Sequence, residues 1–178
     1  MNPSRKFIDY LVSWMGIVAV VGLLIGGGLA LWANSYTNDQ VHSQMASQQI
    51  FFPKPARWPQ LASEAGQQVL TGQQAKDYAD IQILGDMNAM SGGQTYAQLS
   101  SKSRADPTNT KLADLVATVF KGTTLRGLLL NAYAFGTIAT IAGWTALVAF
   151  VGAGLLLILS ILGVLHGAGK LRFPSEKA

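Results

Sequence analysis

The chain has 178 residues, of which 49% are hydrophobic and only 12% are charged, and it carries a formal net charge of +4. It contains no cysteine, which excludes disulfide bonds, structural zinc held by thiolates and thiol catalysis. Residues 33–125 carry seven basic and seven acidic side chains, so the net positive charge lies outside them. A positive chain is often taken to bind nucleic acid, but this distribution indicates membrane topology, and we expect no nucleic-acid partner.

Two stretches lack Asp, Glu, Lys and Arg altogether: Tyr10–Ser35 and Gly127–Gly169. About 20 apolar residues suffice for a helix to cross the hydrocarbon of a bilayer. Lys and Arg beside the ends of a span stay in the cytoplasm, and both ends of the chain, residues 1–6 and 166–178, are short and basic. The sequence therefore predicts a multi-pass protein of the plasma membrane, with both termini in the cytoplasm and residues 33–124 outside.

The first span is predicted over residues 7–32. Its apolar run is longer than the roughly 7–15 residues of a signal peptide's apolar region, which favours an uncleaved anchor. Gly22 and Gly26 lie four apart within the span, and small residues at this spacing let helices pack closely in lipid. We expect these glycines to mediate helix packing, including self-association. The alternative is that glycine is simply common in transmembrane helices.

An exported domain is predicted over residues 33–124. It begins with the proline-containing segment Phe51–Pro59, which cannot form a regular helix because it holds three prolines. We expect this segment to be an extended connector that presents the aromatic residues Phe51, Phe52 and Trp58.

Two helices are predicted after the connector. Thr71 and Gln74 have the spacing of a capping box, which predicts a helix that continues to about Met90 and stops before a Gly-Gly pair. A short helix is expected over residues 95–99, followed by a polar loop over 101–110. A domain of about 90 residues is small for an independent core. We therefore expect it to complete its burial against the membrane helices or a partner.

The second uncharged stretch, residues 127–169, is too long for one simple span. Its 43 residues would extend about 65 Å as a helix, roughly twice the hydrocarbon thickness. One solution is a hairpin that turns near residues 143–145. The favoured solution is a single span over 137–165, preceded by an extramembrane helix that begins near Leu112 and includes residues 125–136. The predicted fold is an all-α membrane protein with two transmembrane helices, the second extending outside the membrane, and a small exported helical cap between them.

No catalytic, cofactor-binding or metal-binding site is predicted. The whole bilayer separates His42 from His166 in the expected topology, so the chain cannot form a two-histidine metal centre. Asp77, Asp80 and Asp86 alternate with apolar residues and Lys in a pattern typical of a solvated face. Apart from Asp9 at the start of the first span, neither span contains an Asp, Glu, Lys, Arg or His, the usual mark of an ion or proton pathway. We expect a protein that is not an enzyme and has no cofactor.

Several short segments carry a family resemblance: 65–69 (AGQQV) with 74–79 (QAKDYA), 93–99 (GQTYAQL), and 125–129 (LRGLL) running on to Tyr133, Phe135 and Gly136. With these segments, the chain resembles a family of small two-span membrane proteins from actinobacteria that is often labelled aromatic ring-opening dioxygenase. The resemblance implies a two-span fold with an exported helical cap. It does not imply the labelled activity, because that chemistry needs two histidines and a carboxylate on one iron.

Two functions remain open. The first is a non-catalytic accessory or structural subunit of a larger membrane complex, with a respiratory complex among the candidates. Its partners would be larger integral membrane subunits and membrane lipids. The second is an extracytoplasmic binding or sensing module for a lipid, quinone or other apolar ligand. The candidate ligand or partner surface consists of aromatic residues, which could instead form a membrane-interface belt: Trp32, Tyr36, Phe51, Phe52, Trp58, Tyr133, Phe135 and Trp144.

Overall fold

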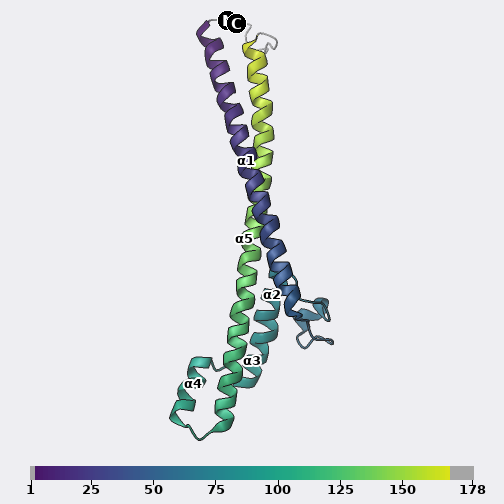
Figure 1. Ribbon diagram of the computed structural model, residues 1–178, viewed down its shortest axis with the longest axis vertical. Coiled ribbons are helices and arrows are strands. Elements are labelled where there is room, and N and C mark those ends of the chain that lie inside the picture. Colours follow the sequence, from purple (N-terminus) through teal and green to yellow (C-terminus); the bar gives the residue numbers. More distant parts are fainter. Residues whose placement is uncertain (1–2, 169–178) are drawn as a thin grey trace. The chain divides into compact units, whose positions relative to one another are not determined.

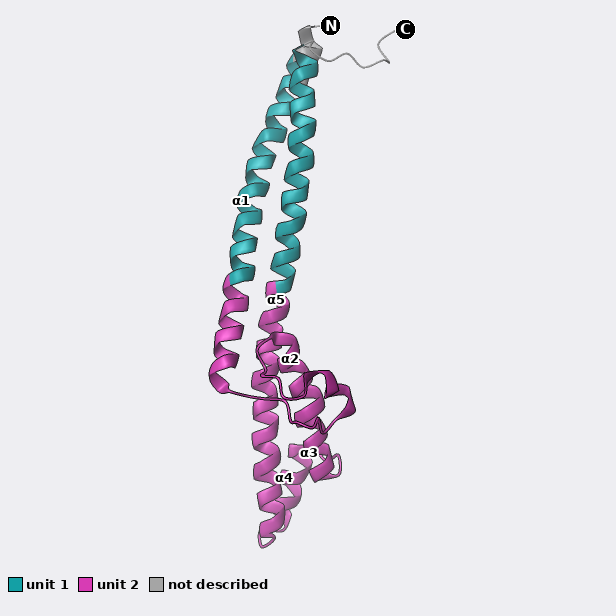
Figure 2. Cartoon of the chain, turned by 90° about the vertical axis from the view of Figure 1, so that its right-hand side faces the viewer, with its two compact units in different colours: residues 1–35, 140–178 teal, residues 36–139 magenta. Residues whose placement is uncertain are grey.

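The computed structural model describes residues 3–168 and shows an all-helical chain (Figure 1). The elements in order are α1 (Pro3–Gln48), the 3-10 helix η1 (Pro59–Glu64), α2 (Gly72–Asp77), the π-helix η2 (Tyr78–Ile83), α3 (Leu84–Ser91), α4 (Tyr96–Ala105) and α5 (Thr110–Gly167). The chain divides into two compact units (Figure 2). Unit 1 comprises Met1–Ser35 and Thr140–Ala178, and unit 2 comprises Tyr36–Ala139, so α1 and α5 each contribute to both.

The two long helices, α1 with 46 residues and α5 with 58, are each long and apolar enough to cross a membrane. Only 11% of the most apolar segment of each helix is buried within the chain. A helix that is apolar all round needs burial in a protein core or in lipid. At 1.5 Å per residue α5 is about 87 Å long, so it exceeds the roughly 30 Å of a bilayer's hydrocarbon.

A single continuous α5 shows that the second apolar stretch is one helix, and the hairpin alternative is wrong. That residues 137–165 of this helix span a membrane stays a prediction. Helix continues through residues 143–145, where the turn would lie. Gly143 does not break it. The missing side chain instead leaves room for Asn34 of α1, whose Nδ2 would lie 2.9 Å from a Cβ at this position.

Unit 1 packs α1 against α5 along a seam of mostly small residues (Figure 2). A seven-residue repeat of buried positions is typical of left-handed coiled-coil packing. A side chain at Gly163 would collide with Ser13 Oγ, and one at Gly16 would collide with Ser160 Oγ, so the two helices approach closely. The buried positions that follow the repeat are Ser13, Val20 and Gly27 on α1, and Ala146, Ala153 and Ser160 on α5.

Gly22 and Gly26 take no part in this seam. No atom lies within 4 Å of the point where a Cβ on either residue would begin. Gly22 is two residues after the buried Val20, which places it about 200° around the helix from the seam. The two glycines are therefore not used for packing within the chain, and their packing against a second copy or a partner stays a prediction.

The core of unit 2 draws on nearly every element of the unit. Among its fully buried members are Phe52 from the connector, Leu61 from η1 and Leu99 from α4. The α5 helix adds Val119 and Leu129, which are 3% and 1% exposed. The long helices thus supply part of the core of the segment between them.

The connector is irregular, as its prolines predict, but it does not present all of its aromatic residues. The Phe52 amide donates to the Gln67 carbonyl at 2.9 Å, and the Phe52 carbonyl accepts from the Gly66 amide at 3.1 Å. Neighbouring side chains of an extended segment point to opposite sides. Phe51 is consequently 53% exposed and Phe52 only 2%, with its ring edge-on to Tyr78. Phe52 belongs to the core, so the expectation that it faces a ligand or partner is wrong.

The predicted capping box at Thr71 is confirmed. Thr71 Oγ1 accepts from the Gln74 amide, and Gln74 Oε1 accepts from the Thr71 amide. The helical run that begins there continues through α2, η2 and α3 and ends at Ser91. Gly92 follows with a φ of 62°, a left-handed conformation that glycine adopts without strain.

The next helix is longer than predicted. A second capping box, formed by Thr95 and Gln98, starts α4, which extends to Ala105 rather than stopping at residue 99. Residues 101–105 are therefore helical, although they were expected to be loop. Lys102 and Arg104 lie in the last turn, where positive charge stabilises a helix C-terminus.

Candidate functional site

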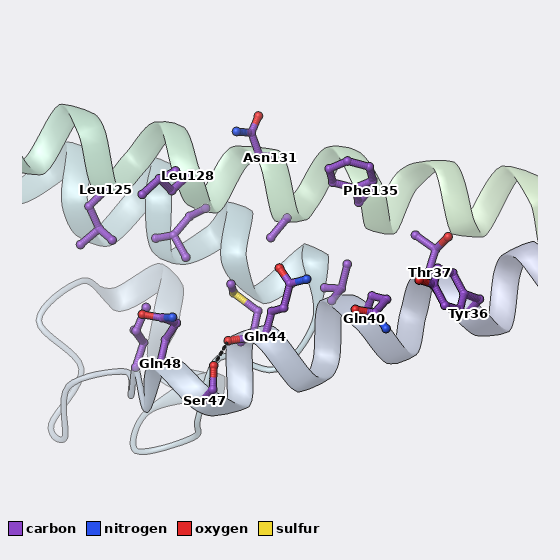
Figure 3. Close-up of a pocket in the computed structure, with 15 residues that line it drawn as sticks. Tyr36, Thr37, Gln40, Gln44, Ser47, Gln48, Leu125, Leu128, Asn131 and Phe135 are labelled. Carbon is purple, nitrogen blue, oxygen red and sulfur yellow. Dashed lines mark hydrogen bonds between the residues drawn. The ribbon is translucent and has the colours of Figure 1, made fainter.

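A cavity of about 630 Å³ lies within unit 2, between the end of α1 and the middle of α5 (Figure 3). This volume falls within the roughly 300–1,000 Å³ that is usual for small-molecule sites. Its lining consists of Tyr36, Thr37, Gln40, Val41, Gln44, Met45, Ser47, Gln48, Ile50, Leu125, Leu128, Leu129, Asn131, Ala132 and Phe135.

The two walls of the cavity differ in chemistry. The α1 wall carries Gln40, Gln44 and Gln48, which are four residues apart and so form a row along one face of the helix. Gln44 reaches from α1 toward α5 (Figure 3). The α5 wall is mostly aliphatic, with Leu128 and Phe135 on it. None of the lining side chains is an Asp, Glu, Lys, Arg or His, so the cavity joins an amide wall to an apolar wall without a formal charge.

The floor of the cavity is continuous with the core of unit 2. Leu129 is 1% exposed, and Met45 packs against the same hydrophobic cluster. Beside the cavity, α2 lies very close to α5: a Cβ on Gly72 would be 3.0 Å from the Ala132 carbonyl oxygen and 3.2 Å from Gly136 Cα. The packing of unit 2 therefore holds the α5 wall in place.

Two of the eight predicted aromatic residues line this cavity, Tyr36 and Phe135. Tyr133 is close to Phe135 in sequence but interacts elsewhere, since the Lys76 ammonium lies 5.0 Å from the centre of its ring. Tyr133 does not line the cavity.

The remaining predicted aromatics are distributed among other environments. Trp58 packs over Gly85, whose missing side chain leaves room for the indole ring. Phe51 is exposed but does not line the cavity. Trp32 and Trp144 belong to unit 1, and each is 64% exposed. The structure thus does not gather the eight residues into one surface.

Two carboxylates of unit 2, Asp80 and Asp86, have separate partners. Arg126 of α5 donates to Asp80 of η2 at 2.6 Å. Asp86 forms an ion pair with Arg57 at 3.0 Å and accepts a hydrogen bond from Gln82 at 2.7 Å. These contacts tie the connector and α5 to the helical run between them. Within residues 3–168, no three His, Cys, Asp or Glu side chains lie close enough together to hold a metal ion.

Two titratable groups of unit 2 have shifted pKa values. Burial, and secondly the charge of Asp77, raise the pKa of the Glu64 carboxyl. Burial, and secondly the charge of Asp86, raise the pKa of the Tyr78 hydroxyl. Both shifts favour the uncharged form of the group, and both follow from packing within unit 2.

The cavity itself was not predicted from the sequence. Val41 is buried and Met45 is half-buried beside it in unit 2. The overlooked signal is the row of glutamines at positions 40, 44 and 48. All three glutamines are exposed residues of α1 that border the cavity.

Comparison of the chain with protein-family models, with curated proteins and with solved structures finds no match. The resemblance to two-span actinobacterial proteins therefore stays a prediction. Two features of the structure bear on function: the outward glycines of α1 and the uncharged cavity of unit 2.

Proposed function

We propose that this protein is a membrane-anchored, non-catalytic accessory subunit of a larger membrane protein complex, with a respiratory complex among the candidates. The observation that carries the proposal is the outward glycine face of α1. Gly22 and Gly26, which are four residues apart and so lie on one face of the helix, have no packed neighbour within 4 Å of where a side chain would begin.

The outward glycines are not needed for packing within the chain. The α1–α5 seam uses other glycines, among them Gly16 and Gly163. In lipid, helices associate through small residues that let their backbones approach, because lipid is as apolar as the side chains and gives no hydrophobic drive. A glycine face that the chain leaves open is suited to a helix of another subunit or of a second copy.

The proposal includes a topology with both termini in the cytoplasm and unit 2 outside. It is supported by the two long apolar helices and by the basic flanks of the chain. Because the chain has no cysteine, single cysteines can test it. A Thr108→Cys variant should react with a membrane-impermeant maleimide in intact cells, whereas an Ala178→Cys variant should react only after lysis. The reverse pattern would refute the topology.

The test of the subunit proposal compares two outward glycines on different helices. Gly26→Leu should reduce the amount of partner protein that co-purifies in mild detergent, because the leucine blocks close approach at the α1 face. Gly154→Leu is the matched control, since Gly154 of α5 also has no atom within 4 Å of its Cβ position. Equal recovery of partners with both variants would argue against the α1 glycine face as the contact.

A second candidate function is the binding of a lipid, quinone or other apolar ligand outside the membrane. The cavity in unit 2 favours it, because a largely apolar pocket with a few polar groups is the usual form of a small-molecule site. Added lipid or quinone extract should raise the thermal stability of the purified protein. An unchanged unfolding profile with every extract would count against this function.

A further inference from the structure

We infer that the cavity of unit 2 binds one uncharged amphiphile, with its hydrogen-bonding end against the glutamine wall of α1 and its hydrocarbon against the apolar wall of α5. The inference rests on the second candidate function and adds the chemical class of the ligand. It is independent of any partner that the outward glycines bind.

The lining of the cavity has no formal charge, which disfavours an anionic ligand. A phosphate or carboxylate placed in a partly enclosed, largely apolar site needs a cation or several strong donors to replace its water. The lining offers no Lys, Arg or His. Arg126, which lies on the same stretch of α5, is committed to Asp80 at 2.6 Å. An anionic headgroup would therefore lose its hydration without gaining an ion pair.

The row of glutamines on α1 favours a ligand with hydrogen-bonding oxygens. Each glutamine side chain offers two N–H donors and a carbonyl acceptor, so it pairs with both hydroxyl and carbonyl oxygens. Gln40, Gln44 and Gln48 repeat this group along the α1 wall, and Asn131 adds another amide from α5. An alcohol, ester or quinone carbonyl fits this wall, while a pure hydrocarbon would leave its amides without partners.

The apolar wall of α5 favours a ligand with a hydrocarbon part. Leu125, Leu128 and Phe135 are exposed to 41%, 61% and 57% although they face the cavity. Removing apolar surface from water is favourable. A hydrocarbon chain or isoprenoid tail on this wall would remove these side chains from water, which an ion or a small polar metabolite would not do.

The first test uses the full-length protein in detergent and measures lipid retained after size-exclusion chromatography by mass spectrometry. The probes are dioleoylglycerol and an isoprenoid quinone, both neutral, and dioleoylphosphatidylglycerol, which has the same acyl chains but an anionic head. We expect retention of a neutral probe to exceed that of the anionic lipid several-fold, and the two neutral probes to identify a glyceride or a quinone as the source. Equal retention of the anionic lipid would overturn the assignment of class but leave apolar binding intact. Retention of none of the probes would overturn both the inference and the second candidate function.

Two matched pairs of variants localise the binding. Leu128→Trp fills the cavity and should abolish retention of the neutral probe, whereas Ile138→Trp, at another exposed position of α5 that does not line the cavity, should not. Gln44→Lys places a cation on the amide wall and should raise retention of phosphatidylglycerol several-fold. Ser43→Lys adds the same charge one residue away but outside the lining and should not. If the members of either pair behave alike, the ligand does not occupy this cavity.

Discussion

In unit 1 the buried positions are mostly small residues such as Ser13, Gly27 and Ala153, whereas in unit 2 they include Phe52, Leu61 and Leu99. The large apolar side chains of unit 1 are mostly exposed, Trp32 and Trp144 among them. Unit 2 adds capping boxes and ion pairs around a core of large side chains. The proposed topology accounts for the difference, because small residues suffice where lipid covers the remaining surface, while water requires the large side chains to be buried.

The largest effect should come from the core of unit 2. Phe52→Ala removes a fully buried ring and should lower the free energy of unfolding by about 3–5 kcal/mol. The neighbouring Phe51→Ala is the control, because Phe51 is 53% exposed and a surface change of this kind usually alters stability by roughly 0.5 kcal/mol or less. Limited proteolysis of the purified protein over a denaturant series would measure both. Similar losses of unfolding free energy for the two variants would show that unit 2 lacks a core of large buried apolar side chains.

A smaller effect is expected at the seam of unit 1. Gly163→Leu forces a side chain into the space that Ser13 occupies, and overpacking of this kind costs about 1–3 kcal/mol. Gly154→Leu adds the same side chain to α5 where no atom lies within 4 Å. Loss of helical signal during titration with a denaturing detergent should come earlier for Gly163→Leu alone. If both variants resist equally, the close seam does not stabilise unit 1.

The ion pair between Asp80 and Arg126 should contribute less than either of these to the stability of the protein. Both side chains are 32% exposed, so solvent screens the pair, and we expect a coupling energy of about 1 kcal/mol. A double-mutant cycle with Asp80→Asn and Arg126→Met in the proteolysis assay would measure it. Strictly additive effects would mean that hydrophobic packing alone holds the helical run of unit 2 on α5.

The smallest effect concerns the pH dependence of unit 2. Because the pKa of Glu64 is raised in the folded protein, folding favours its protonated form, and the stabilisation is fully present below its ordinary value of 4.5. It is lost as the pH rises through the raised pKa. Glu64→Gln should therefore make unit 2 slightly more stable than the parent at neutral pH and flatten the pH profile of its unfolding. An unaltered profile would remove Glu64 as a source of pH dependence.

Much of the fold could be predicted from local signals in the sequence. Uncharged length predicts the two long helices, and the Thr71–Gln74 spacing predicts the start of the helical run in unit 2. The extent of α4 could not be predicted as well, because the polar residues 101–105 are equally compatible with loop and with helix.

The packing and the candidate site were harder to predict. The Gly22–Gly26 motif is conspicuous in the sequence, yet the seam follows the register of Ser13, Val20 and Gly27, which only the pairing with α5 selects. The cavity likewise needs two segments about 90 residues apart in sequence to meet. Tyr36 and Phe135 were recognised as surface candidates, but the glutamines that line the cavity with them have no individual signal of function.

Purification tests directly whether the protein is an accessory subunit of a larger membrane complex. The chain would carry an affinity tag at Ala178, be expressed at its native level and be extracted in mild detergent. We expect a stoichiometric assembly with larger membrane subunits, identified by mass spectrometry and weakened by Gly26→Leu. Recovery of the protein alone as a monomer would contradict its role as an accessory subunit.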